Sequence, residues 1–201
     1  MTLMQKENTM LRQSLSAIVL LAGLLIGSSA MAQWTLDNDQ SKLSFVTIKA
    51  DHVAEVHTFD RLAGSINASG EVSITIELAS INSLIPIRDE RMQAMLFETN
   101  LFPEAMVSGS VDIADLRAME PGESRALTLD VSLDLRGDAR DYPAEILVTR
   151  TQNGVVASTL KPILVTADNH TLAAGVEALR EIAGLPSISR AVPVSFTVVF
   201  E

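Results

Sequence analysis

Three histidines, His52, His57 and His170, are the first residues to consider for metal binding or proton transfer. His52 and His57 lie five residues apart, and this spacing places two side chains on opposite faces of a β-strand. No third ligand lies near them in sequence, so the spacing favours exposed or core histidines over a metal site. Catalysis on a lipid-like substrate would require His52 or His57 beside an acid in the interior of the fold.

Motifs for covalent or phosphate chemistry are missing from the sequence. The chain has no cysteine, which excludes disulfides, thiolate metal sites and cysteine nucleophiles. It has neither the G-x-S-x-G motif of serine hydrolases nor a glycine-rich loop for phosphate binding. The residues therefore give no support for a catalytic or metal site, and we expect a protein that is not an enzyme, although a Ser-His-Asp arrangement formed by the fold stays open.

The charged segment Arg88-Asp89-Glu90-Arg91 has two interpretations. It begins a predicted helix directly after the break at Pro86. In the first interpretation, Arg88 and Arg91 bind an anionic or polar headgroup at the mouth of a cavity. In the second, which we favour, the two acids lie favourably at the helix N-terminus and the arginines pair with neighbouring acids.

Alternation of apolar and polar residues dominates the chain and predicts β-strands. In residues 127–136 every odd position is apolar and every even position is polar, as in an antiparallel strand with one dry face and one wet face. Residues 71–78 and 192–198 repeat this alternation. Weaker strand patterns cover residues 42–49, 52–59, 62–68, 105–113, 144–151 and 155–160.

Two segments have helical spacing instead. Residues 88–97 predict a short helix after Pro86, and residues 171–183 predict a second one. Asn169 or Thr171 is the candidate N-cap of the second helix, and Gly184 is its predicted end.

About eight to ten strands with short turns predict an all-β fold with two short helices, either a meandering barrel or a sandwich. A barrel of about eight strands can enclose one small ligand. Periodicity alone leaves a filled core and a ligand cavity equally open. If the sheet closes, the inward residues include Leu43, Phe45, Ile74, Ile76, Val107, Val111, Leu129, Val131, Leu133, Val194 and Phe196, with Met95, Phe97, Leu101 and Phe102 over an opening.

The N-terminus has the three parts of a cleavable signal peptide, predicted over residues 1–32. Lys6 and Arg12 precede the apolar run of residues 17–26, and Ala30-Met31-Ala32 forms an A-x-A cleavage site. The start is Met1 or Met10. We therefore expect one exported domain, residues 33–201, in the periplasm.

The balance of charge limits the partners. The formal net charge is −10 and no basic stripe is present, which argues against binding nucleic acid or anionic membrane surfaces. No later segment is long and apolar enough for stable membrane insertion. The oligomeric state stays open between monomer and homodimer.

Six short segments follow one another in a distinctive order: Trp34–Asp37, Ser41–Phe45, Phe59–Ile66, Ile87–Met92, Leu96-Phe97 and Phe102–Ala105. Their order resembles the YceI-like family of bacterial periplasmic proteins, also described as polyisoprenoid-binding. The resemblance spans the region after the predicted signal peptide, and its most specific part is residues 88–105. The chain departs from the family where Lys49 is followed by Ala50-Asp51 in place of a Lys-His pair.

The resemblance implies an antiparallel lipocalin-like β-barrel with an elongated apolar tunnel. It also implies a long-chain isoprenoid lipid as the partner, either a polyprenyl phosphate or an isoprenoid quinone, and no catalytic residue or cofactor. The alternatives are an extracytoplasmic stress or interaction protein with a packed interior, and an enzyme acting on lipid. The expected ligand-binding residues are Phe45, Ile74, Ile76, Arg88, Arg91, Met95, Phe97, Phe102, Val107, Val111, Leu129, Val131, Leu133, Val194 and Phe196.

Overall fold

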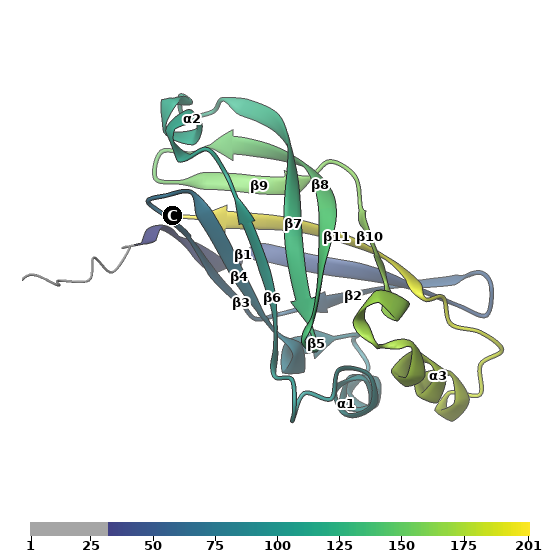
Figure 1. The fold of residues 1–201 in the computed structure, drawn as a ribbon. Coiled ribbons are helices and arrows are strands. Elements are labelled where there is room, and N and C mark those ends of the chain that lie inside the picture. The colour runs from purple at the N-terminus through teal and green to yellow at the C-terminus, as the bar shows by residue number, and fades with distance from the viewer. Residues whose placement is uncertain (1–31) are drawn as a thin grey trace, which may run out of the picture. The chain divides into compact units, whose positions relative to one another are not determined.

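Eight strands of one antiparallel sheet close into a barrel in the computed structural model, which describes residues 32–201 (Figure 1). Closure leaves the ring without a free edge, and it confirms the lipocalin-like fold class. The predicted signal peptide lies outside the described residues except for Ala32. In order, the ring consists of β1 (Ala32–Lys49), β3 (Leu62–Asn67), β4 (Glu71–Glu77), β6 (Glu104–Ser110), β7 (Ser124–Leu135), β8 (Asp138–Arg150), β9 (Val155–Thr159) and β11 (Ala191–Phe200), which pairs with β1.

Three further strands extend the sheet at one end of the barrel, where β1 and β11 continue beyond the ring. Strand β2 (Val53–Phe59) pairs with the second half of β1, and the short β5 (Ile81–Asn82) pairs with β2. Strand β10 (Ile163–Thr166) pairs with the first half of β11. The backbone at this end therefore forms a wall on which helices can pack.

Helices cover both ends of the barrel (Figure 1). Beside the extended wall lie η1 (Leu78–Ser80), α1 (Pro86–Arg91), the π-helical turn η2 (Met92–Phe97), η3 (Ala167–His170) and α3 (Ala173–Ile182). At the other end, α2 (Ile113–Ala118) and the residue after it bury the side chains of Leu116 and Met119. The space between the two ends is lined by the inward residues of the strands, which alternate with outward polar residues.

The structure corrects the prediction of only two short helices. Residues 105–113 were expected to form one strand, but β6 ends at Ser110 and α2 begins at Ile113. The Asp112 side chain accepts hydrogen bonds from the backbone N–H groups of Ala114 and Asp115, which fixes the start of α2. Val111 and Ile113 continue the apolar–polar alternation of a strand. The sequence pattern therefore did not reveal the helix cap at Asp112.

The start of the last helix was also predicted wrongly. Neither Asn169 nor Thr171 caps α3, which follows Leu172 without a side-chain cap, and Thr171 itself has a φ of 55°. The predicted end is confirmed at Gly184, whose φ of 62° is the left-handed conformation that ends many helices.

Gly175 lets α3 lie directly on η2. A Cβ atom at this position would lie 2.6 Å from the Met95 carbonyl oxygen and 2.9 Å from Leu96 Cα. Gly175→Ala should therefore destabilise the protein by about 1–3 kcal/mol through overpacking, although alanine is the better helix former by about 1 kcal/mol. Urea unfolding measures this, and a stabilised Gly175→Ala variant would contradict the close packing of α3 on η2.

Candidate functional site

The barrel interior holds a cavity of about 380 Å³. This volume lies within the range of roughly 300–1,000 Å³ that is usual for ligand pockets. Side chains from every strand of the ring and from α1, η2, α2 and α3 line the cavity, and most of them are aliphatic or aromatic. The interior is therefore hollow and apolar, which sets it apart from a fully packed barrel.

Nearly all the residues expected from the sequence to bind a ligand belong to the cavity wall. Met95 and Phe102 do not. The turn η2 is π-helical and buries Met92, Leu96 and Phe97, so Met95 is turned away from the interior. Phe102 instead lies beneath the Arg136 guanidinium. The Arg136 Cζ atom is 5.3 Å from the centroid of the Phe102 ring. The wall includes Phe45, Ile74, Ile76, Arg88, Arg91, Phe97, Val107, Val111, Leu129, Val131, Leu133, Val194 and Phe196.

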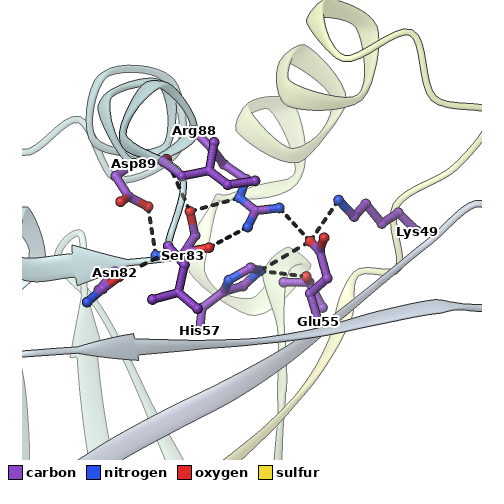
Figure 2. A network of polar contacts seen from close by, with 10 residues as sticks. Lys49, Glu55, His57, Asn82, Ser83, Arg88 and Asp89 are labelled. Carbon is purple, nitrogen blue, oxygen red and sulfur yellow. Dashed lines mark hydrogen bonds and ion pairs between the residues drawn. The ribbon is translucent and has the colours of Figure 1, made fainter.

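The charged residues of the wall lie at the end of the cavity that α1 and α3 cover. Lys49 and Glu55 come from β1 and β2, and Arg88 and Arg91 come from α1. We call Thr47, Lys49, Glu55, His57, Ser83 and Arg88 the polar cluster; most of it is labelled in Figure 2. The cavity wall is thus mostly apolar along the barrel and carries charged side chains at one end only.

Arg88 ties α1 to β2 and to the loop before the helix (Figure 2). Its Nη1 lies 2.5 Å from Glu55 Oε2, and its Nε donates to Ser83 Oγ at 2.8 Å. Its Nη2 donates to the Ser83 carbonyl oxygen, and Asp89 accepts from the Ser83 backbone N–H at 2.9 Å. The structure therefore shows the pairing of arginine and acid expected in the second interpretation of this segment. A headgroup contact of Arg88 or Arg91 stays a prediction.

Glu55 is shared between two cations. Its Oε2 lies 2.7 Å from Lys49 Nζ as well as close to Arg88. Partial burial acts to raise the pKa of Glu55, but the hydrogen bond from Lys49 and the charge of Arg88 outweigh burial, and the pKa lies below its ordinary value. Glu55 is therefore ionised at neutral pH and already has its partners.

His57 lies at the boundary between this charged end and the apolar wall. Its side chain is 2% exposed, its ring centroid lies 5.3 Å from that of Phe45, and its Nε2 is 2.9 Å from Thr47 Oγ1. Burial lowers the pKa of His57, and the charge of Arg88 lowers it further. The imidazole is therefore neutral at neutral pH. His52, by contrast, lies exposed in the turn between β1 and β2, so the two histidines do not act together.

A second group of polar contacts holds the helical cover in place. Arg136, in the turn between β7 and β8, forms an ion pair with Glu98, and its Nη1 donates to the Thr171 carbonyl oxygen at 3.1 Å. Arg136, Glu98 and Thr171 all have positive φ angles. No sequence pattern predicts this contact, because the three residues lie far apart in the chain and belong to no motif.

Residues 32–201 contain neither a cluster of metal-binding side chains nor a membrane-spanning helix. No three His, Cys, Asp or Glu side chains in this range are arranged to hold a metal ion. None of its helices has both the length and the hydropathy to cross a membrane.

Comparison with solved structures places the barrel among known proteins. A polyisoprenoid-binding domain from Saccharophagus degradans, implicated in plant cell wall breakdown, is 36% identical, with a TM-score of 0.83 over 85% of this chain and 98% of that one. BcnA of Burkholderia cenocepacia is 16% identical, with a TM-score of 0.63 over 81% and 98% of the two chains. The YceI protein of Campylobacter jejuni is also 16% identical, with a TM-score of 0.51 over 72% and 84%. The last two show the fold alone.

No curated protein matches the chain. The family model for the YceI-like domain, however, matches residues 34–200, which is almost all of the described barrel. On this match and on the likeness to the Saccharophagus domain, the chain belongs to the YceI-like family.

Proposed function

We propose that this protein is a periplasmic lipid-binding protein that holds one isoprenoid-type lipid, a polyprenyl phosphate or an isoprenoid quinone, in the barrel cavity. The observation that carries the proposal is the continuous apolar wall of the cavity, with charged side chains at one end only. A lipid has the same two parts when it consists of a long hydrocarbon chain and one polar headgroup at its end. The relative from Saccharophagus degradans, itself described as polyisoprenoid-binding, adds support.

The apolar wall suits a branched hydrocarbon chain. Burial of such a chain is worth roughly 25 cal/mol for each Å² removed from water, before the entropic costs of binding. Aliphatic side chains such as Ile74, Val107 and Val131 require no directional partner from the ligand. Only the headgroup would need polar contacts, and it would meet them at the polar cluster.

The polar cluster is organised for binding rather than for catalysis. A catalytic dyad needs an acid that orients one ring nitrogen of histidine while the other nitrogen acts on the substrate. Here Glu55 and Thr47 both lie on the Nε2 side of His57, at 4.0 Å and 2.9 Å. Glu55 is also held by Lys49 and Arg88. The protein therefore acts as a carrier or store of lipid and not as an enzyme.

Native mass spectrometry with lipid extraction tests this function. The protein should be expressed with its own N-terminal segment and purified from the periplasm. We expect an isoprenoid to co-purify in a near-stoichiometric amount. If the protein purified from the periplasm carries no lipid and also fails to take up added isoprenoid quinone or polyprenyl phosphate, the result would favour a stress or interaction role for the barrel surface.

A further inference from the structure

One buried nitrogen in the cavity wall lacks a hydrogen-bond partner. Among the described residues, three buried side-chain polar atoms have none: His57 Nδ1, Arg136 Nε and Arg150 Nε. Such atoms are rare in folded proteins, because each costs about 1–3 kcal/mol relative to a satisfied group. Each of these three atoms therefore needs a structural or functional explanation.

The two arginine atoms have a simple structural setting. Each belongs to a guanidinium that is hydrogen-bonded elsewhere: Arg136 binds Glu98 and Thr171 through its two Nη atoms, and Arg150 Nη1 donates to the carbonyl oxygens of Thr151 and Gly154. Each guanidinium also lies over an aromatic ring. Neither arginine belongs to the cavity wall, whereas His57 does.

The protein offers no second partner to the His57 ring. Thr47 serves Nε2, and a single hydroxyl can serve only one ring nitrogen. Glu55, the nearest acid, is 4.0 Å from Nε2, beyond hydrogen-bonding distance, and its oxygen is occupied by Lys49 and Arg88. The neighbouring Phe45 presents only an apolar ring. One ring nitrogen of this cavity-wall residue is thus left without a hydrogen-bond partner.

We propose that His57 is the headgroup anchor of the cavity: its unpartnered nitrogen hydrogen-bonds a carbonyl or hydroxyl oxygen of an uncharged lipid headgroup. This rests on the proposed function and narrows it to the isoprenoid quinone type of ligand over the polyprenyl phosphate type. The ring lies where the apolar wall meets the charged residues, which is where the headgroup of a lipid with its chain in the barrel would lie.

The state of the cluster favours an uncharged headgroup over an anionic one. Arg88 and Lys49, the two cations nearest to His57, already bind Glu55, and Arg88 binds Ser83 as well. A neutral imidazole needs no counter-charge and hydrogen-bonds equally well with a neutral carbonyl or hydroxyl.

Paired ligands test the anchor. His57→Leu keeps an apolar side chain of similar size and removes both nitrogens. We expect it to lower the affinity for an isoprenoid quinone about three- to tenfold, the loss of one ordinary hydrogen bond, and to leave the affinity for squalene, which has no polar atom, unchanged. Phe45→Leu, at the adjacent wall position, is the matched control and should weaken quinone and squalene alike. A free polyprenol separates hydroxyl from carbonyl recognition.

Nitrogen-15 NMR of the histidine rings in the wild-type protein gives a second readout that needs no variant. Quinone binding should shift the Nδ1 resonance of His57, and squalene binding should not. Wild-type protein that binds no isoprenoid would defeat the proposed function itself. Wild-type protein that binds quinone, with equal loss of quinone and squalene in His57→Leu or no loss at all, would overturn the anchor alone. If His57→Leu weakens the binding of polyprenyl phosphate but not of quinone, His57 belongs to an anion site and not to an anchor for uncharged headgroups.

Discussion

Phe196→Asp should abolish lipid uptake, lowering the affinity for an isoprenoid at least about a hundredfold, while the barrel still folds. Phe196 lies on the inward face of β11 and lines the cavity. A carboxylate there would face hydrocarbon without a partner in the occupied barrel, at a cost of several kcal/mol. In the empty barrel, water can solvate the same carboxylate, so the penalty falls mainly on the bound state.

Two further variants make this result decisive. Val131→Asp places the same charge on the wall from β7, across a different part of the ring, and should have the same effect. Leu164→Asp is the control, because Leu164 lies on β10 next to β11 and is 66% exposed on the outer surface. It exchanges an apolar residue for aspartate without reaching the cavity. Native mass spectrometry and circular dichroism report occupancy and folding together, and a folded Phe196→Asp protein that retains lipid would contradict the cavity as the binding site.

Period-two alternation was sufficient to predict the strands, because it records which face of each strand is dry. It left barrel and sandwich open, and only the resemblance to the YceI-like family favoured the barrel. The inward positions of β4, β7 and β11 follow directly from the alternation. Alternation reports side-chain direction and not the space in front of the side chain, so it left filled core and cavity open. The closed sheet is curved because β11 pairs with β1. This curvature keeps the inward side chains of opposite strands apart, and their separation leaves the cavity.

The polar cluster shows where sequence reasoning stops. Arg88 was a candidate because of its charged segment, but its partner Glu55 is 33 residues away in the chain. His57 was considered together with His52 as a metal ligand or beside an unnamed acid, since the spacing of the two histidines was visible and the fold around them was not. The strand β2 carries His57 inward and leaves His52 in the turn. Such contacts depend on the register of β1 with β2 and on the docking of α1, which no local pattern encodes.

His170→Ala should destabilise the protein by about 3–4 kcal/mol, counting the cavity left by the ring and the two hydrogen bonds lost. The side chain is fully buried. Its Nδ1–H donates to the Asp138 carbonyl oxygen at 2.9 Å, so Nε2 accepts from the Tyr142 hydroxyl at 2.8 Å. These bonds fasten η3, and through it α3, to β8. Tyr142→Phe is the matched control: it removes one hydroxyl and should cost only about 1–2 kcal/mol in urea unfolding.

The pH dependence of the free energy of unfolding separates two effects of His170→Ala. The cavity that the missing ring leaves would not by itself change this dependence, whereas the loss of a titrating imidazole would. Burial lowers the pKa of His170, and the hydrogen bond to the Asp138 carbonyl oxygen offsets this only in part; the pKa of His57 is lowered likewise. Below a pH of about 6.5 the unfolded chain therefore binds more protons than the folded barrel, and the free energy of unfolding falls as the pH decreases. Between pH 7 and pH 5.5, above the range where carboxyl groups protonate, His170→Ala should reduce this slope. An unchanged slope in His170→Ala would mean that the buried ring takes up its proton without cost to the fold.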